Sequence, residues 1–424
     1  MDIPANLAPR TAMLRATLTR FFIPPGTTSD AGLLLWARGL RAFGDGFISL
    51  LLPFYLMLLG FGAFEVGLII TATLLGSGLM TLAVGLIAHR HSNRSLLLAA
   101  SVLMIASGIA MLFARDFWPL IIIAFVGTLN PSTGDVSVFS PLEHTLLART
   151  VQARSRTALF ARYSLVGALV GAVGAQAAGL TSAATGVLNL ELKTAAQAMF
   201  VLYGLLGIAV LLLYRRLSPR LDAHEEAHVP VPLGPSRGIV YKLAALFSLD
   251  SFAGGFAVQS LLALWLFDRF ALSISAAGTI FFWVGVLSAL SQLLASKLAA
   301  RYGLINTMVF THIPASIFLI LVPFMPTLSL ALLFLFLRSF LSQMDVPART
   351  SYVMAVVSPG ERPAAASVTA VPRSLASAIS PSIAGYLLTF SSFGWPLVIC
   401  GVLKITYDLL LLRMFGKIKP PEER

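Results

Sequence analysis

The chain has 424 residues, of which 57% are hydrophobic and only 11% are charged. A soluble domain carries about 25% charged residues, so this composition excludes a soluble globular protein and indicates an integral membrane protein. The net charge of +12 does not indicate a nucleic-acid partner, because the basic residues lie in short loops between apolar spans. The one cysteine, Cys400, excludes an intramolecular disulfide and a cysteine metal cluster.

Residues 1–30 are predicted to form a cytoplasmic tail, because they carry Arg10, Arg15 and Arg20 but no apolar core followed by a cleavage site. Apolar spans long enough to cross a bilayer follow it. They fall near 32–59, 64–88, 95–114, 117–147, 157–178, 197–214, 239–267, 272–296, 304–325, 328–356, 364–390 and 394–412. The span 117–147 contains Asn130-Pro131 and Pro141, so we expect a break within it.

Basic residues are unevenly divided between the loops on the two sides of these spans. The loops on one side carry only Arg115, Lys193 and Arg269, whereas most other Lys and Arg residues fall on the opposite side. By the positive-inside rule, both termini are predicted to lie in the cytoplasm. The predicted location is the inner (plasma) membrane, as a multi-pass protein.

A polar, proline-rich stretch, 215–238, is predicted to link a six-span bundle at 31–214 to a second one at 239–412, with a cytoplasmic tail at 413–424. The stretch contains HEEAH, which matches the HExxH zinc signature. It lies between prolines and lacks further ligands, so we interpret the match as chance and expect no metal or other cofactor. The two bundles repeat each other at an offset near 210 residues, for example at Gly174 and Gly385. Parallel repeats of this kind are a transporter layout.

The loop from Gly85 to Arg94, GLIAHRHSNR, resembles the signature loop G-x-L-A-D-R-x-G-R-R of the major facilitator superfamily. His89 stands at the position that is acidic in that family. The family's acid helps to hold the outward-facing state through a network of charges on the cytoplasmic side, so we expect that network to be made differently here. The resemblance covers the whole chain and is to the bacterial twelve-helix type. It implies an all-α membrane protein with twelve transmembrane helices in two pseudo-symmetric six-helix bundles. Candidate gating residues are Gly85, His89, Arg90, Arg94, Glu143 and Arg301.

In that family helices one, four, seven and ten line the central cavity, and here each carries one aspartate: Asp45, Asp135, Asp250 and Asp345. A buried carboxylate without a full partner can take up and release a proton. We predict Asp135 as the first proton carrier and Asp345 as the second. A structural ion pair one helical turn away is the competing interpretation for Asp45, with Arg41, and for Asp345, with Arg349.

Arginines inside the spans are predicted to form a charge network or to bind an anionic substrate: Arg41, Arg162, Arg338, Arg349 and Arg373. Arg41 and Asp250 occupy equivalent positions in the repeats with opposite charges, so they could pair between the bundles. The drug/proton antiporter branch of the family carries an arginine early in helix four. This chain has none there, although Arg338 stands at the equivalent place in helix ten. Further candidate cavity contacts are Gln343, Phe139, Phe252 and Phe340.

We predict a secondary active transporter that exports a small organic molecule in exchange for protons, working as a monomer in the lipid bilayer. One alternative is uptake of an organic anion by symport, with the anion held by Arg162, Arg338 and Arg373. Another is a membrane receptor or scaffold of the same fold. The sequence shows no nucleophile–base constellation and no G-x-x-x-x-G-K-[ST] loop, so we expect neither an enzyme nor an ATP-driven pump.

Overall fold

The computed structural model describes residues 27–87, 90–132, 137–222, 233–416 and 418, and there the chain is helical apart from turns and one β-bridge, Thr27 to Val151. In the first half the helices are α2 (Ser29–Leu58), α3 (Ala63–Ile87), α4 (Asn93–Phe113), α5 (Phe117–Val126), α6 (Phe139–Arg149), α7 (Ala153–Ala177), α8 (Leu180–Leu188), α9 (Leu192–Arg215) and the 3-10 turn η1 (Pro219–Asp222). In the second half they are α10 (Arg237–Gly255), α11 (Gln259–Phe270), α12 (Ile274–Tyr302), α13 (Leu304–Leu321), η2 (Val322–Phe324), α14 (Leu328–Leu341), α15 (Asp345–Val356), η3 (Pro359–Glu361), α16 (Arg362–Phe390) and α17 (Trp395–Phe415).

In the described part of the chain, 10 helical segments are long and apolar enough to cross a membrane. They match the predicted spans except 117–147 and 364–390. The first divides into α5, which is only 10 residues long, and α6, as the prolines led us to expect. The second is α16, which at 29 residues is long enough to span a bilayer, but its internal Pro372 and Pro381 and its serines lower its hydropathy.

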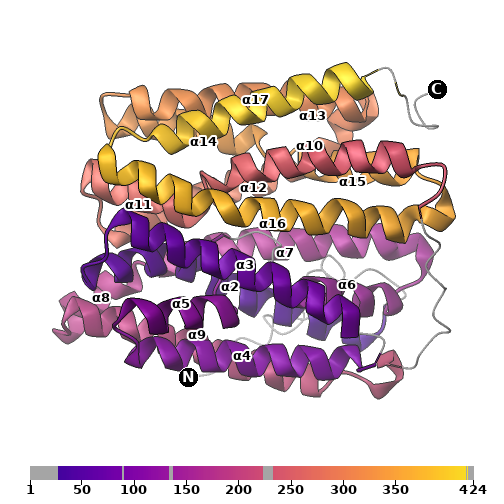
Figure 1. Cartoon of the computed structure of the whole chain (residues 1–424). Helices are drawn as coiled ribbons and strands as arrows, with labels where there is room; N and C mark the ends of the chain where they lie inside the picture. The colour runs from indigo at the N-terminus through magenta and orange to yellow at the C-terminus, as the bar shows by residue number, and fades with distance from the viewer. Residues whose placement is uncertain (1–26, 88–89, 133–136, 223–232, 417, 419–424) are drawn as a thin grey trace, which may run out of the picture.

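The helices form the predicted two bundles, α2–α9 and α10–α17, which lie side by side (Figure 1). We call the side where residues 215–237 connect the bundles the linker side, and the opposite side the far side. Between the bundles α3 packs on α16, α7 on α12 and α2 on α11. The exact domain boundaries stay a prediction.

Hydrogen bonds between the bundles lie at mid-depth or toward the far side. The amide of Gln259 donates to the hydroxyl of Ser49 at 2.8 Å, and the Ser260 hydroxyl donates to the carbonyl oxygen of Ser49 at 2.6 Å. The α3–α16 contact is close because two glycines face each other. A Cβ added at Gly67 would lie 2.6 Å from the Pro381 carbonyl and 3.0 Å from the Cα of Gly385. Small residues let membrane helices approach at backbone distance.

Helices four and ten of the repeat are both interrupted. After α5 the chain leaves the helix at Gly127 and passes Asn130-Pro131, where proline offers no N–H to continue the helix, before α6 begins. In the second repeat α14 ends at Leu341 and α15 begins at Asp345, which puts a carboxylate in its first turn. An acid there is favourable because it faces the positive end of the helix dipole. Both interruptions therefore leave a short helix, α6 or α15, on the linker side.

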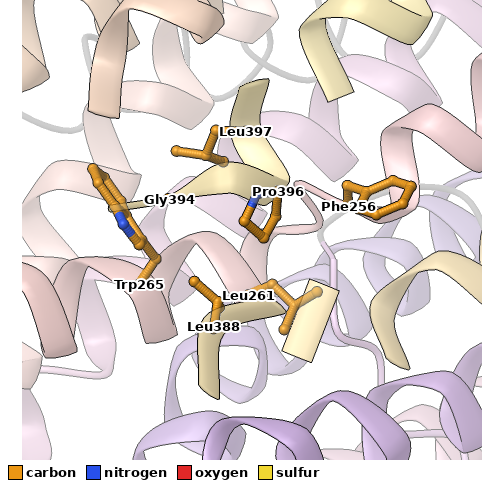
Figure 2. A pocket seen from close by; sticks show the side chains of 7 residues that line it. All are labelled: Phe256, Leu261, Trp265, Leu388, Gly394, Pro396 and Leu397. Atoms are coloured by element: carbon orange, nitrogen blue, oxygen red, sulfur yellow. The ribbon is translucent and has the colours of Figure 1, made fainter. Parts of the chain in front are cut away.

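Apolar side chains of the second bundle pack closely at its far side. Figure 2 shows side chains of α11, α16 and α17 converging on a pocket beside Trp265 that has no room for a water molecule. Gly394 takes a φ of +94° there, and a Cβ on it would lie 2.7 Å from the Trp265 ring nitrogen, so only glycine fits. Next to it lies a cavity of about 360 Å³ between the bundles. Its lining comprises Met57, Phe61, Gly62, Ala63, Leu264, Trp265, Asp268, Leu388 and Thr389.

On the linker side, Glu361 in η3 fastens the end of the linker to the second bundle. Its carboxylate accepts hydrogen bonds from the hydroxyls of Ser358 at 2.6 Å and Ser236 at 2.7 Å, and from the backbone N–H of Gly234. Because these donors favour the ionised carboxylate, they lower the pKa of Glu361 to about 2.

Candidate charge clusters on the interrupted helices

The first bundle buries one carboxylate that joins four helices. Glu143 of α6 is fully buried and accepts a hydrogen bond from the guanidinium of Arg41 on α2. The hydroxyls of Tyr163 on α7 and Tyr214 on α9 also donate to it, the latter at 2.6 Å. We call these four residues the N-half cluster. Phe139, one turn before Glu143 on α6, places its ring centroid 4.3 Å from the Arg41 guanidinium carbon, a cation–π distance.

The N-half cluster corrects the predicted pair of Arg41 with Asp45. Arg41 turns to Glu143, because the interruption in helix four directs α6 toward α2. Asp45 is buried and accepts a hydrogen bond from Asn130, in the interruption itself. Glu143 is therefore part of a buried ion pair, a more central place than the gating role predicted for it.

The second bundle buries a larger set of charges. Arg349 of α15 donates to Asp345, one turn earlier on the same helix, and to Asp250 of α10 at 2.9 Å. The ammonium of Lys404 on α17 donates to the other oxygen of Asp250 at 2.7 Å. We call these four residues the C-half cluster. The predicted i,i+4 contact between Asp345 and Arg349 is thus present, and the second carboxylate on Arg349 comes from a different helix.

The two clusters occupy related positions in the repeat. Phe139 and Arg349 are 210 residues apart, and Arg41 and Asp250 are 209 apart. The cation–π contact of Arg41 with Phe139 in one bundle therefore stands where the ion pair of Asp250 with Arg349 stands in the other. Arg41 and Asp250 each pair within their own bundle, so the predicted pair between the bundles is wrong.

The remaining candidate arginines differ in their contacts. One guanidinium nitrogen of Arg162 is buried without a hydrogen-bond partner among the described residues. Arg338 is half-buried, and its side chain makes no hydrogen bond or ion pair within the described ranges. Arg373 is exposed, and its Nε donates to the Ser251 hydroxyl at 2.9 Å. Within the described residues Asp345 forms its ion pair with Arg349 and not with Arg338 or Arg373.

Other candidates from the sequence have local contacts. The backbone N–H of Gln343 donates to the Ser291 hydroxyl at 3.3 Å. The ring of Phe252 meets that of Phe256 edge-on at 5.4 Å, and Phe340 is half-buried. None of the three belongs to either cluster as described.

Three of the candidate gating residues, Gly85, Arg94 and Arg301, lie near the ends of helices on the linker side. Arg94 donates to the carbonyl oxygens of Tyr214 at 3.3 Å and Arg215 at 2.5 Å, and so joins α4 to the end of α9. Arg301 lies over the ring of Tyr302, 5.4 Å from its centroid. A Cβ added at Gly85 would meet nothing within 4 Å.

The remaining predicted sites are Arg90, which has a local backbone contact, and residues that the structure does not describe. The N–H of Arg90 donates to the carbonyl of Ile87 at 2.8 Å. His89, Asp135 and the HEEAH stretch lie outside the described residues, so their roles stay predictions. Within the described ranges, no group of three or more His, Cys, Asp or Glu residues is arranged to hold a metal ion.

Three buried or half-buried residues of this region were missed from the sequence: Lys404, Asp408 and His312. His312 lies in the span 304–325, and Lys404 and Asp408 lie four residues apart in 394–412. The signal was available, because a charge in an apolar span marks a functional position by default. Charges were named as candidates in spans one, four, five, seven, ten and eleven, but not in spans nine and twelve.

Comparison with known proteins supports this description. Residues 34–267 and 243–424 match the family model of the Major Facilitator Superfamily. A relative in Saccharomyces cerevisiae, the uncharacterized membrane protein YJR124C, is 25% identical over 431 residues, covering 92% of this chain and 96% of the relative. The inward-open xylose transporter XylE from E. coli has a similar structure over 93% of this chain and 98% of its own, at a TM-score of 0.71 and 15% identity. The nucleoside transporter NupG is similar over 92% of this chain and 100% of its own, at 0.69 and 14%.

Proposed function

The chain belongs to the Major Facilitator Superfamily and is a multi-pass membrane transporter rather than an enzyme, and from this premise we propose that it exports a small organic molecule in exchange for protons. The observation that carries the proposal is the pair of buried charge clusters on the interrupted helices. Each one fastens a short helix, α6 or α15, to other helices of its own bundle.

Burying these ions is costly, so their retention needs a reason beyond stability. The free-energy penalty of desolvating an ion pair commonly exceeds the Coulombic gain, and apolar residues of similar volume are often as stable. Charges inside the membrane are therefore taken as functional unless shown otherwise. In the C-half cluster, a proton that weakens the attraction between Arg349 and its two carboxylate partners, Asp345 and Asp250, would free α15 from those contacts. A proton can thus change the position of a helix that the family resemblance places at the cavity.

The proposed direction rests on which side of the bundles is joined. The hydrogen bonds of Ser49 with Gln259 and Ser260, and the ring contacts of Phe54 with Phe267 and of Phe64 with Tyr386, hold the bundles together at mid-depth and toward the far side. The clusters lie toward the linker side, which we propose to be cytoplasmic because it carries most of the basic loop residues. Substrate would then load from the cytoplasm and leave through the far side, where the cavity of about 360 Å³ lies.

A second candidate, symport of an organic anion, is favoured by a specific observation. The buried guanidinium nitrogen of Arg162 has no hydrogen-bond partner among the described residues, and Arg338 has no ion pair there. Guanidinium groups bind carboxylates and phosphates in a bidentate manner. An anionic substrate would accept hydrogen bonds from these N–H groups.

Proton antiport and anion symport can be distinguished with purified protein in liposomes that enclose the pH dye pyranine. Tetraphenylphosphonium, benzoate, uridine and xylose are added outside in turn, as a cation, an anion and two neutral compounds. Inward movement of a substrate by antiport expels protons and raises the lumenal pH, whereas symport lowers it. We expect a rise in pH that Asp345→Asn abolishes while radiolabelled substrate exchange continues. The matched control, Asp116→Asn, changes an exposed carboxylate in the loop before α5 on the far side and should retain the signal.

A fall in lumenal pH would establish the symport reading instead. Substrate uptake without any change in lumenal pH would refute proton coupling in both forms.

A further inference from the structure

Behind the C-half cluster lies a second buried pair, made by His312 on α13 and Asp408 on α17. The Nδ1 atom of His312 is 3.1 Å and 3.0 Å from the two carboxylate oxygens of Asp408. Asp408 is fully buried and His312 is 4% exposed. By the repeat, α13 and α17 belong to helices nine and twelve, outside the four that line the cavity. The pair is therefore not part of the site expected from the family resemblance.

The pair is connected to the C-half cluster through its other nitrogen. The Nε2 atom of His312 is 3.4 Å from the Nζ of Lys404 and 4.0 Å from an oxygen of Asp250. That same oxygen accepts the hydrogen bond of Lys404 at 2.7 Å. Contacts thus run without a gap from Asp408 through His312, Lys404 and Asp250 to Arg349.

The residues joined by these ion pairs include one more carboxylate than permanent cation. Three carboxylates, Asp250, Asp345 and Asp408, face two permanent cations, Arg349 and Lys404. A net charge buried in a medium of low dielectric is strongly disfavoured, so a proton is favoured on one member of the set. His312 is the member suited to bind that proton, because one ring nitrogen stays bonded to Asp408 while the other has a lone pair that can accept it.

His312 has charged and titratable neighbours on three helices, α17, α15 and α10. From α17 they are Lys404, Tyr407 and Asp408; from α15, Asp345 and Arg349; from α10, Asp250. The charged residues of the other two helices against α13 are Arg338 on α14, which lies near Cys400, and Lys297 and Arg301 toward the linker end of α12. Arg373, whose Nε donates to the Ser251 hydroxyl, lies at the edge of the set and is exposed.

We propose that His312, held by Asp408, is the site where the coupling proton binds, and that Lys404 and Asp250 carry its effect to α15. This inference rests on the proposed proton coupling and identifies the group responsible. In the unprotonated state Nδ1–H donates to Asp408, and the lone pair of Nε2 faces the ammonium of Lys404 at hydrogen-bond distance.

A proton arriving from water binds Nε2 and removes that lone pair. The new N–H repels the ammonium of Lys404 and attracts Asp250, which is already within 4.0 Å. Asp250 is then shared between His312 and Arg349, so its attraction to Arg349 on α15 weakens. Loss of the proton to water reverses each of these changes.

The test measures the arrangement of the bundles directly and needs no substrate. Cys400→Ser protein receives cysteines at Arg216 and Arg413, at the linker ends of α9 and α17, and both are spin-labelled. Electron–electron distance distributions are recorded in lipid nanodiscs between pH 5 and pH 9. We expect two populations whose ratio changes at least tenfold across this range. His312→Gln should hold the ratio constant, whereas His91→Gln, an exposed loop histidine, should behave as the parent protein.

A second variant keeps the proposal testable if His312→Gln does not fold. Asp408→Asn removes the negative charge that favours a protonated imidazole, so the midpoint of the transition should move to lower pH by about one unit or more. A ratio that still follows pH in His312→Gln, a midpoint that Asp408→Asn leaves in place, or a parent protein without any transition would each overturn the proposal. Proton-driven transport in liposomes that survives in His312→Gln would overturn this assignment while leaving proton coupling intact.

Discussion

Replacing Arg349 by leucine isolates the energetic role of the C-half cluster. Asp250 would keep its hydrogen bond from Lys404, but Asp345, which is 3% exposed, would lose the partner that the structure gives it. Removing one partner of a buried pair costs about 3–5 kcal/mol, because the other charge stays buried and uncompensated. At about 1.4 kcal/mol for each factor of ten, the unfolding equilibrium should rise between a hundredfold and several thousandfold.

The double variant Arg349→Leu with Asp345→Leu should recover most of this loss, to within about 1–2 kcal/mol of wild type, because an apolar pair can replace a buried ion pair. Cys400 supplies the assay, since it is the chain's one cysteine and is fully buried. A thiol-reactive fluorophore reports its exposure as SDS is titrated into mixed micelles. Arg413→Gln, at an exposed site in the last turn of α17, is the control and should change little.

A single variant as stable as the Arg413 control would show that Asp345 does not depend on Arg349. A double variant as unstable as the single one would attribute the loss to the packing of the arginine stem instead of the orphaned carboxylate.

Three further predictions concern other parts of the molecule. Gly67→Val should lower the free energy of unfolding by about 1–3 kcal/mol in the same Cys400 assay, because the α3–α16 contact has no space for a side chain. Gly85→Ala should not lower it, because a Cβ there meets nothing. Equal stability of the two variants would refute the close contact. The Glu361 carboxylate, with its pKa lowered to about 2, should protect the backbone N–H of Gly234 from hydrogen exchange at pH 7 and at pH 4, and this protection should be lost as the pH falls toward 2. Glu361→Gln should lose the protection at every pH. Exchange that the substitution leaves unchanged would contradict the contact. Cysteines at Arg216 and Arg115 in Cys400→Ser protein should be labelled from opposite sides of the membrane, and labelling from one side would contradict the predicted topology.

Local features of the fold and site followed from the sequence. The spans were predicted because about twenty apolar residues are needed to cross a bilayer, whatever packs against them. The interruption of helix four was predicted because Asn130-Pro131 prevents continuation of the helix. The contact of Asp345 with Arg349 was predicted because residues four apart share a helix face.

Contacts between distant segments did not follow in this way. Arg41 and Glu143 are 102 residues apart, and they meet only because the interruption redirects α6. Asp250 and Lys404 are 154 residues apart and meet because α10 packs on α17. The charge pattern alone gave the sign of each group but not its partner. Consequently the sequence paired Arg41 with Asp45 or Asp250, and the structure pairs it with Glu143.

The most direct test of proton coupling is accumulation of substrate against its gradient. Liposomes containing the purified protein are given an acidic lumen, one pH unit below the outside, and a labelled substrate identified by the pyranine assay is added outside. One-for-one electroneutral exchange with protons predicts accumulation of about tenfold inside, since one pH unit corresponds to about 1.4 kcal/mol. Asp345→Asn should stop at an inside-to-outside ratio of about one. A wild-type protein that also stops at one would contradict the account.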